Sequence, residues 1–138
     1  MTLLSWSDQY LIGNPTIDAE HRELFRLIND FHSHWQERQQ RQDIAFVLNR
    51  LVSYAQEHFR HEEEIMAAAG YPRLAEHHQV HEHLFDAIFR LHEEYMEQDR
   101  HLEQDTMKFV KSWLVEHIIN NDYLFRDFLA KKQADGQS

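Results

Sequence analysis

The sequence predicts an all-α protein, an up-down-up-down four-helix bundle with an extended N-terminal arm. Glycine and proline are scarce, at 3 and 2 of 138 residues, so few positions interrupt a helix. Apolar residues recur at helical spacing in four long segments. Short polar or breaker-containing links separate these segments, which favours antiparallel packing of successive helices.

The first two predicted elements are the arm, over about residues 1–15, and a helix over about residues 17–37. We expect Trp6 and Tyr10 to anchor the arm on the bundle. Pro15 and a capping residue precede the helix and mark its start. Its apolar stripe, on which His21 also falls, consists of Leu24, Phe25, Ile28, Phe31 and Trp35.

Three further helices are predicted over about residues 43–69, 73–97 and 104–131, and residues 1–138 form one expected domain. Gly70 and Pro72 end the second helix, since glycine favours a helix C-terminus and proline cannot continue it. The apolar stripes include Leu48, Leu51, Phe59 and Met66 in the second helix, Leu84, Ile88 and Leu91 in the third, and Val110, Trp113, Leu114 and Ile118 in the fourth.

Charge and composition exclude several functions. Lysine and arginine number 14 against 24 acidic residues, and the net charge of −10 repels nucleic acid and anionic membranes. Cysteine is absent, which excludes disulfides, iron–sulfur clusters and thiolate catalysis. No apolar run reaches the roughly 18 residues of a membrane span. We therefore expect a cytoplasmic monomer without membrane insertion. The 12 histidines need an explanation.

Potential metal donors lie on or beside the apolar stripes of all four predicted helices. His58 and Glu62 are four residues apart, as are His77 and His81, so each pair projects from one helix face. In a regular α-helix Asp122 lies about 140° around from His117. Asp122 would then not stack on His117 but would reach across to a second metal ion. With His21, these residues supply five imidazoles and two carboxylates.

Seven donors are too many for one tetrahedral zinc ion. They suit a dinuclear centre with carboxylate bridges and terminal imidazoles, a donor set acceptable to iron. The alternative is a metal-free core of hydrogen-bonded histidines and carboxylates. For Asp122 a second alternative is a side chain turned to solvent.

The same residues resemble the ligand signature of the hemerythrin family. The resemblance rests on His21, HFRHE at residues 58–62, HHQVH at residues 77–81 and HIINND at residues 117–122. WSDQYLIG at residues 6–13 and GYP at residues 70–72 agree with it, and it extends over about residues 3–130. The length is similar to that of the single-domain bacterial members.

The resemblance implies reversible dioxygen binding by a carrier, storage or delivery protein that is not an enzyme. It also implies two iron ions (Fe2+/Fe3+) with an oxo or hydroxo bridge. His77, His81 and His117 would bind one iron, whereas His21 and His58 would bind the other and leave one position open. Glu62 and Asp122 would bridge the pair. The implied partners are dioxygen and an oxygen-consuming enzyme as recipient.

An apolar wall is needed to keep water and anions from such a centre. Five apolar residues are one to four positions from a proposed ligand and form the expected oxygen pocket: Leu24, Phe59, Trp113, Leu114 and Ile118. The seven remaining histidines, together with Glu63 and Glu64, are expected on solvent-facing surfaces.

Other functions stay open at this point. The same site could serve a di-iron redox enzyme or a sensor of O2 or NO, and a zinc-stabilised or iron-storing bundle is a third class. Carboxylate-rich di-iron enzymes use E-x-x-H pairs, and the sequence contains none. Storage would need more ions than seven donors can hold, so oxygen carriage or delivery is the simplest hypothesis.

Overall fold

The computed structural model describes residues 4–37, 41–98 and 104–136, and within these ranges all regular structure is helical. A short 3-10 helix, η1 (Asp8–Tyr10), lies in the arm. The bundle consists of α1 (Pro15–Gln36), α2 (Arg41–Ala69), α3 (Leu74–Gln98), α4 (Gln104–His117), η2 (Ile118–Asp122) and α5 (Tyr123–Gly136). The all-α fold predicted from the sequence is confirmed.

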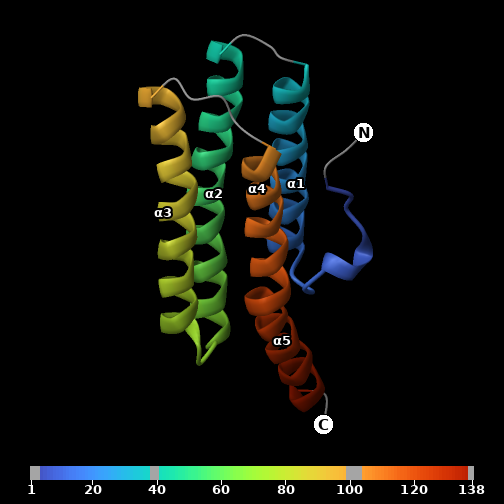
Figure 1. The fold of residues 1–138 in the computed structure, drawn as a ribbon. Helices are drawn as coiled ribbons and strands as arrows, with labels where there is room; N and C mark the ends of the chain where they lie inside the picture. The colour runs from blue at the N-terminus through green and yellow to red at the C-terminus, as the bar shows by residue number, and fades with distance from the viewer. Residues whose placement is uncertain (1–3, 38–40, 99–103, 137–138) are drawn as a thin grey trace.

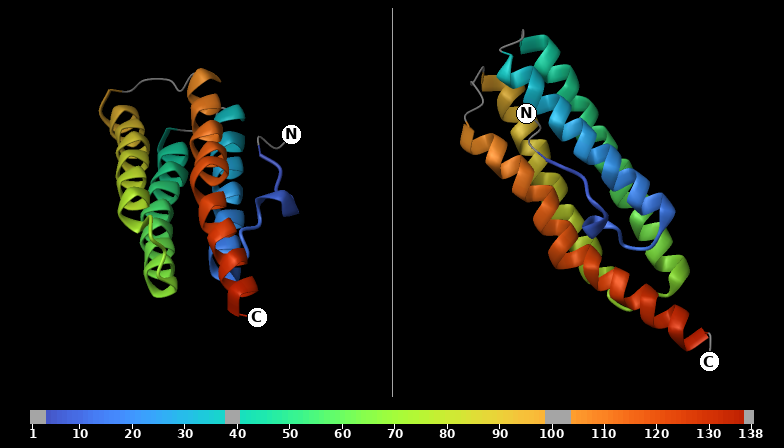
Figure 2. Two further views of the ribbon diagram at one scale, coloured as in Figure 1. Left: turned by 90° about the horizontal axis from the view of Figure 1, so that it is seen from below. Right: turned by 90° about the vertical axis from the view of Figure 1, so that its right-hand side faces the viewer.

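The helices run alternately up and down (Figure 1). Figure 1 shows α1 rising, α2 descending beside it and α3 rising again. The segments α4, η2 and α5 form one descending rod, which Figure 2 shows from two further sides. This is the predicted up-down-up-down topology, with each rod antiparallel to the preceding one.

The arm packs on the bundle through aromatic rings and backbone hydrogen bonds. Trp6 and Tyr10 each lie 5.1 Å from the ring centroid of Phe25. Asn29 in α1 exchanges two 2.8 Å hydrogen bonds with the backbone of Leu4. The right-hand view of Figure 2 shows the arm running along α1 and the last rod. Trp6 and Tyr10 therefore anchor the arm as expected.

Two local signals set the ends of α1 and α2. Asn14 caps α1, since its side chain accepts a hydrogen bond from the backbone N–H of Ile17 at 3.1 Å, and Pro15 occupies the first helical turn. The helix thus begins two residues earlier than predicted. Gly70 follows α2 with φ of 74°, a left-handed conformation that glycine adopts without a steric penalty.

The last rod contains one wider turn that the sequence did not predict. We expected one regular helix over about residues 104–131. Instead, η2 is a turn of π-helix between α4 and α5. Its backbone hydrogen bonds link residue i to i+5, so residues five apart come close to alignment. This turn contains Asp122 and directly follows His117.

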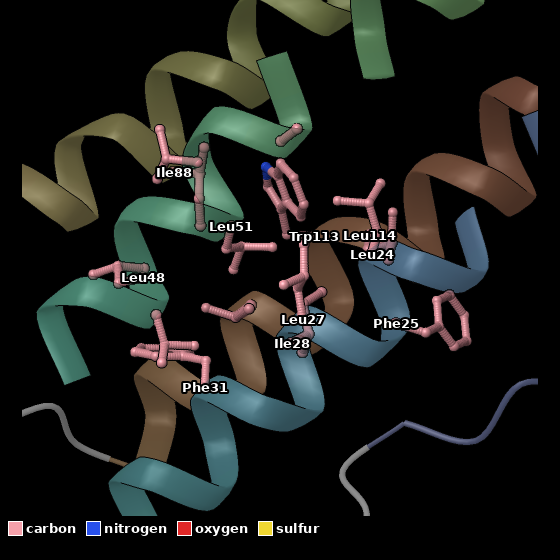
Figure 3. Packing of buried hydrophobic residues seen from close by; sticks show 14 of the residues in the cluster. Leu24, Phe25, Leu27, Ile28, Phe31, Leu48, Leu51, Ile88, Trp113 and Leu114 are labelled. Atoms are coloured by element: carbon pink, nitrogen blue, oxygen red, sulfur yellow. The ribbon is translucent and has the colours of Figure 1, made fainter. Parts of the chain in front are cut away.

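Two apolar clusters fill the bundle. The larger contains residues from all four rods, including Leu24, Leu48, Leu51, Ile88 and Leu114, and Figure 3 shows part of it. The smaller consists of Ile12, Ile17, Met66, Tyr71 and Phe125. Some of the buried polar residues lie between the two clusters along the chain, as His21 does between Ile17 and Leu24 and Glu62 does between Phe59 and Met66.

Candidate metal centre

The seven donors predicted from the sequence are all buried. None exposes more than 4% of its surface, and Glu62, Asp122 and His21 expose none. A carboxylate without compensation is costly to bury, and these two carboxylates lie close enough for Glu62 to raise the pKa of Asp122. The interior must therefore supply positive charge. The alternative of an Asp122 side chain turned to solvent is wrong.

The donors gather in two groups that share one residue. The donor atoms of each group lie within 4.8 Å of one another in the part of the chain that the structure describes. Glu62 belongs to both groups. The larger group is Glu62, His77, His81, His117 and Asp122, and the smaller is His21, His58 and Glu62.

Glu62 divides its two oxygens between the groups. Oε1 lies 2.7 Å from Nε2 of His77 and 3.0 Å from Nε2 of His81. Oε2 lies 3.2 Å from Nε2 of His21 and 3.0 Å from Nε2 of His58. The larger group contains three histidines and the smaller contains two, so we call them the three-histidine side and the two-histidine side. Glu62 thus faces each side with a different oxygen, as a bridging ligand would.

Asp122 repeats this division. Oδ1 lies 3.1 Å from His77 and 3.2 Å from His117, and Oδ2 lies 3.0 Å from His21. Our prediction that Asp122 lies about 140° around from His117 and does not stack on it is wrong, because the π turn removes most of the offset of a regular α-helix. The predicted reach to a second group is observed as well.

Outer hydrogen bonds fix two of the imidazole rings. Nδ1 of His58 donates to Glu20 at 2.9 Å, and Nδ1 of His81 donates to Glu63 at 2.8 Å. An ionised carboxylate can only accept, so each Nδ1 carries a proton. In a neutral ring Nε2 then has no proton, and its lone pair points into the centre.

Several donor atoms of the centre lie close together, and some of them have no hydrogen-bond partner. Nε2 of His58 and both oxygens of Asp122 lack a hydrogen-bond partner despite their close neighbours. Nε2 of His81 and Nε2 of His117 lie 3.2 Å apart. Two donors that bind one ion at right angles, each at about 2.1 Å, would be about 3.0 Å apart. The donor set therefore fits metal ions, and its imidazole nitrogens and carboxylate oxygens are suited to iron.

Protons are the competing source of positive charge. Burial lowers the pKa values of His21, His77 and His117, but contacts with Glu62 and Asp122 outweigh it and raise them to about 9, 9 and 10. Burial raises the pKa values of Glu62 and Asp122, but the histidines bring both well below their usual values. The carboxylates are ionised and attract cations.

Sequence reasoning missed the outer carboxylates. Burial alone raises the pKa of Glu20, but hydrogen bonds from His58 and His61 outweigh it and lower the pKa. The second oxygen of Glu20 accepts from Nδ1 of His61 at 2.7 Å. Glu63 likewise accepts from His81 and, with its other oxygen, from His78.

The structure corrects two expectations about which side chains face solvent. Glu63, expected on a solvated face, exposes only 21% of its side chain because it reaches toward His81. His32 is 9% exposed and packs its ring 5.8 Å from that of Trp35, so it also differs from the expectation for non-ligand histidines. His78, at 52% side-chain exposure, does face solvent, and His101 lies outside the described residues.

The five predicted pocket residues lie together in the larger apolar cluster. Each exposes 5% or less of its surface: Leu24, Phe59, Trp113, Leu114 and Ile118. The ring of Phe59 stacks on His81 with centroids 4.2 Å apart and lies 5.9 Å from His117. Figure 3 shows Leu24 and Leu114 among the side chains of this cluster. An apolar wall thus adjoins the three-histidine side.

Comparisons with known proteins agree with this geometry. Residues 13–128 match the family model described as the hemerythrin HHE cation binding domain. The chain is 33% identical over 129 residues to a bacteriohemerythrin of Stenotrophomonas maltophilia, covering 92% of this chain and 82% of that protein. It is 30% identical over 121 residues to a myohemerythrin of Riftia pachyptila, covering 88% and 89%.

Solved structures give the same result. A wild-type hemerythrin crystal structure superposes with a TM-score of 0.83 at 28% identity, covering 91% of this chain and 96% of that one. The fold and site define a four-helix protein with a histidine- and carboxylate-rich cation site. The chain belongs to the hemerythrin family. Among its described residues, no helix combines the length and apolar character that crossing a membrane requires.

Proposed function

We propose that this protein binds dioxygen reversibly at a di-iron centre and acts as an oxygen carrier, store or delivery protein. The observation that carries the proposal is the division of Glu62: one oxygen faces the three-histidine side and the other the two-histidine side. A single metal ion would not require both oxygens in this way. Membership of the hemerythrin family supports the choice of iron.

In this proposal the two irons are not equivalent. His77, His81 and His117, with Oε1 of Glu62 and Oδ1 of Asp122, would hold one iron. A smaller set would hold the other: His21 and His58, with the remaining carboxylate oxygens. The first iron would thus have five protein donors and the second would have four. An oxo or hydroxo bridge would raise the two coordination numbers to six and five, which would leave a vacant position on the two-histidine side.

The irons would supply the two electrons that reversible dioxygen binding uses. Besides holding the irons, the chain's own residues have two tasks. Leu24, Leu114 and their buried neighbours exclude water. Glu20 and Glu63 orient His58 and His81 through their Nδ1 protons.

We favour carriage over turnover because the centre is rich in imidazole. Five neutral imidazoles leave more positive charge on the irons than a carboxylate-rich set would, which favours reversible binding over oxygen activation. The relative from Riftia pachyptila, which matches 88% of this chain, is named a myohemerythrin, and this supports the choice of an oxygen-binding protein. An oxygen-consuming recipient, a monomeric state and a cytoplasmic location stay predictions.

The test begins with iron analysis and anaerobic reduction of the purified protein. Oxygen is then admitted and removed while the absorption spectrum is recorded. We expect about two irons per chain and a charge-transfer band that appears with oxygen and disappears without it. Continuous oxygen consumption in the presence of a reductant would indicate an enzyme instead. One zinc ion per chain and no band would indicate a structural metal site.

A further inference from the structure

A groove of about 760 Å³ opens on the outer face between α2 and α3. Its lining includes the aromatic side chains of Phe59 and Phe85 and one proposed ligand, His81. Phe85 lies 5.9 Å from Phe89, which is 44% exposed, so the apolar lining continues onto the surface of α3. The groove thus combines an aromatic floor with contact to the candidate metal centre.

The rim of the groove is acidic. Glu63, Glu64, Glu82 and Asp86 line it, and Arg60 is the single lysine or arginine among the lining residues. Glu82 exposes 65% of its side chain and contacts Nε2 of His78 at 3.0 Å. His78 also lines the groove, and its contacts with Glu63 and Glu82 raise its pKa. Four carboxylates against one guanidinium and this one imidazole still give the face a negative potential that attracts cations and repels anions.

The groove also offers a short path from the surface to the centre. Nδ1 of His81 donates to Glu63, a partly exposed residue of the rim, at 2.8 Å. The Phe59 ring, which lines the groove, stacks on His81 at 4.2 Å. Electron transfer weakens steeply with distance, so an electron donor seated here would be favourably close to a proposed iron ligand.

We propose that this groove docks a basic electron-donor protein that returns the oxidised centre to the ferrous state. The proposal rests on the oxygen-binding function, because only a reduced centre can bind dioxygen reversibly. Two one-electron transfers reduce two ferric ions to two ferrous ions, and two donor molecules are each oxidised by one electron. The partner would place lysine or arginine side chains on Glu64, Glu82 and Asp86 and apolar side chains on the aromatic floor.

Charge decides between the candidate occupants. Small reductants that carry phosphates or carboxylates would be repelled by the rim. A second copy of this chain, with a net charge of −10, would be repelled as well. A protein with a basic patch gains attraction from the rim and burial of apolar area from the floor.

The first test measures the reduction rate of the diferric protein by stopped flow with two small probes. Hexaammineruthenium(II) is a cationic donor, and the ferrous complex of EDTA is an anionic one. In E64Q/E82Q/D86N we expect the rate with the ruthenium probe to fall about tenfold at low ionic strength. The difference should vanish in high salt, and the rate with the EDTA complex should not fall.

A matched variant, D8N/E116Q/D127N, removes the same charge from exposed residues outside the groove lining. We expect it to change the ruthenium rate by less than about twofold. Equal slowing in both triple variants would overturn the proposal, because reduction would then depend only on net charge.

A second test does not depend on electron transfer. Octalysine is coupled to the intact protein with a carbodiimide, and the linked carboxylates are mapped by mass spectrometry. We expect linkage to favour Glu64, Glu82 and Asp86. Linkage at Glu116 and Asp127 to the same extent would overturn the docking surface.

Oxygen binding is measured on the same samples, which separates the two hypotheses. A parent protein that shows the ruthenium preference but no reversible oxygen band would overturn the oxygen function and support the groove. A parent protein that binds oxygen but shows no difference between the triple variants would overturn the groove alone.

Discussion

The two sides of the candidate centre differ in how many protein donors they offer and in what surrounds them. The three-histidine side has His77, His81 and His117, and its outer wall is the apolar ring of Phe59. The two-histidine side has His21 and His58, whose rings lie 4.7 Å apart. Both sides use the same two carboxylates. In the proposed di-iron centre, the chain would therefore fill one coordination sphere and leave room in the other.

Removing the shared carboxylate should have the largest effect. Glu62→Ala takes an oxygen from both sides at once, so we expect iron content to fall from about two per chain to almost none. Metal analysis after reconstitution measures this. Glu64→Ala is the control, since Glu64 lies two residues away on the same helix and is exposed. Stoichiometric iron in Glu62→Ala would mean that the ligand assignment is wrong.

Removing the histidines of one side should remove only the iron proposed for that side. The double variant His21→Ala/His58→Ala leaves the five donors of the three-histidine side intact. We therefore expect about one iron per chain and no reversible oxygen band. Metal analysis and absorption spectroscopy provide both readouts. Retention of two irons, or loss of both, would contradict the assignment of separate sides.

Glu20→Gln should weaken the two-histidine side selectively. The neutral amide can still accept from His58 but no longer offers a charged acceptor, and such outer partners are typically worth about 10- to 100-fold in metal affinity. We expect one of the two irons to be released to a chelator about tenfold faster. Glu23→Gln is the matched control, since Glu23 pairs with Arg26 on the surface of the same helix. Identical release from both variants would argue against an orienting role for Glu20.

Leu114→Ala should give the smallest change, a severalfold faster oxidation of the reduced protein in air. The shorter side chain removes part of the apolar wall three residues from His117 and admits water. Leu48→Ala is the control: Leu48 is fully buried, but it is ten residues from His58, about 15 Å along the helix axis. Leu48→Ala should lower the free energy of unfolding by about 2–5 kcal/mol without changing the oxidation rate. Equal oxidation rates in the two variants would contradict the proposed wall.

The helices and the buried donors could be predicted because spacing along one helix determines which face a residue occupies. His58 and Glu62 are four apart, and their predicted common face is observed. His32 was misplaced although a signal existed, since it lies seven residues after Phe25 on the same stripe. A closer count of that stripe would have placed it in the core.

Two features could not be derived from spacing. The π turn before Asp122 depends on a shift of backbone hydrogen bonds, and no residue pattern in the segment 118–122 marks it. The contacts of Glu20 with His58 and His61 join different helices, so they depend on how α1 and α2 pack. The position of Glu20 beside His21 in the sequence was the available hint.

The most direct test of the central hypothesis is a crystal structure of the iron-loaded protein with anomalous scattering at the iron edge. We expect two peaks per chain: one in contact with His77, His81 and His117, the other with His21 and His58, and Glu62 touching both. A single peak, or a second peak away from His21 and His58, would contradict the hypothesis of one shared dinuclear centre.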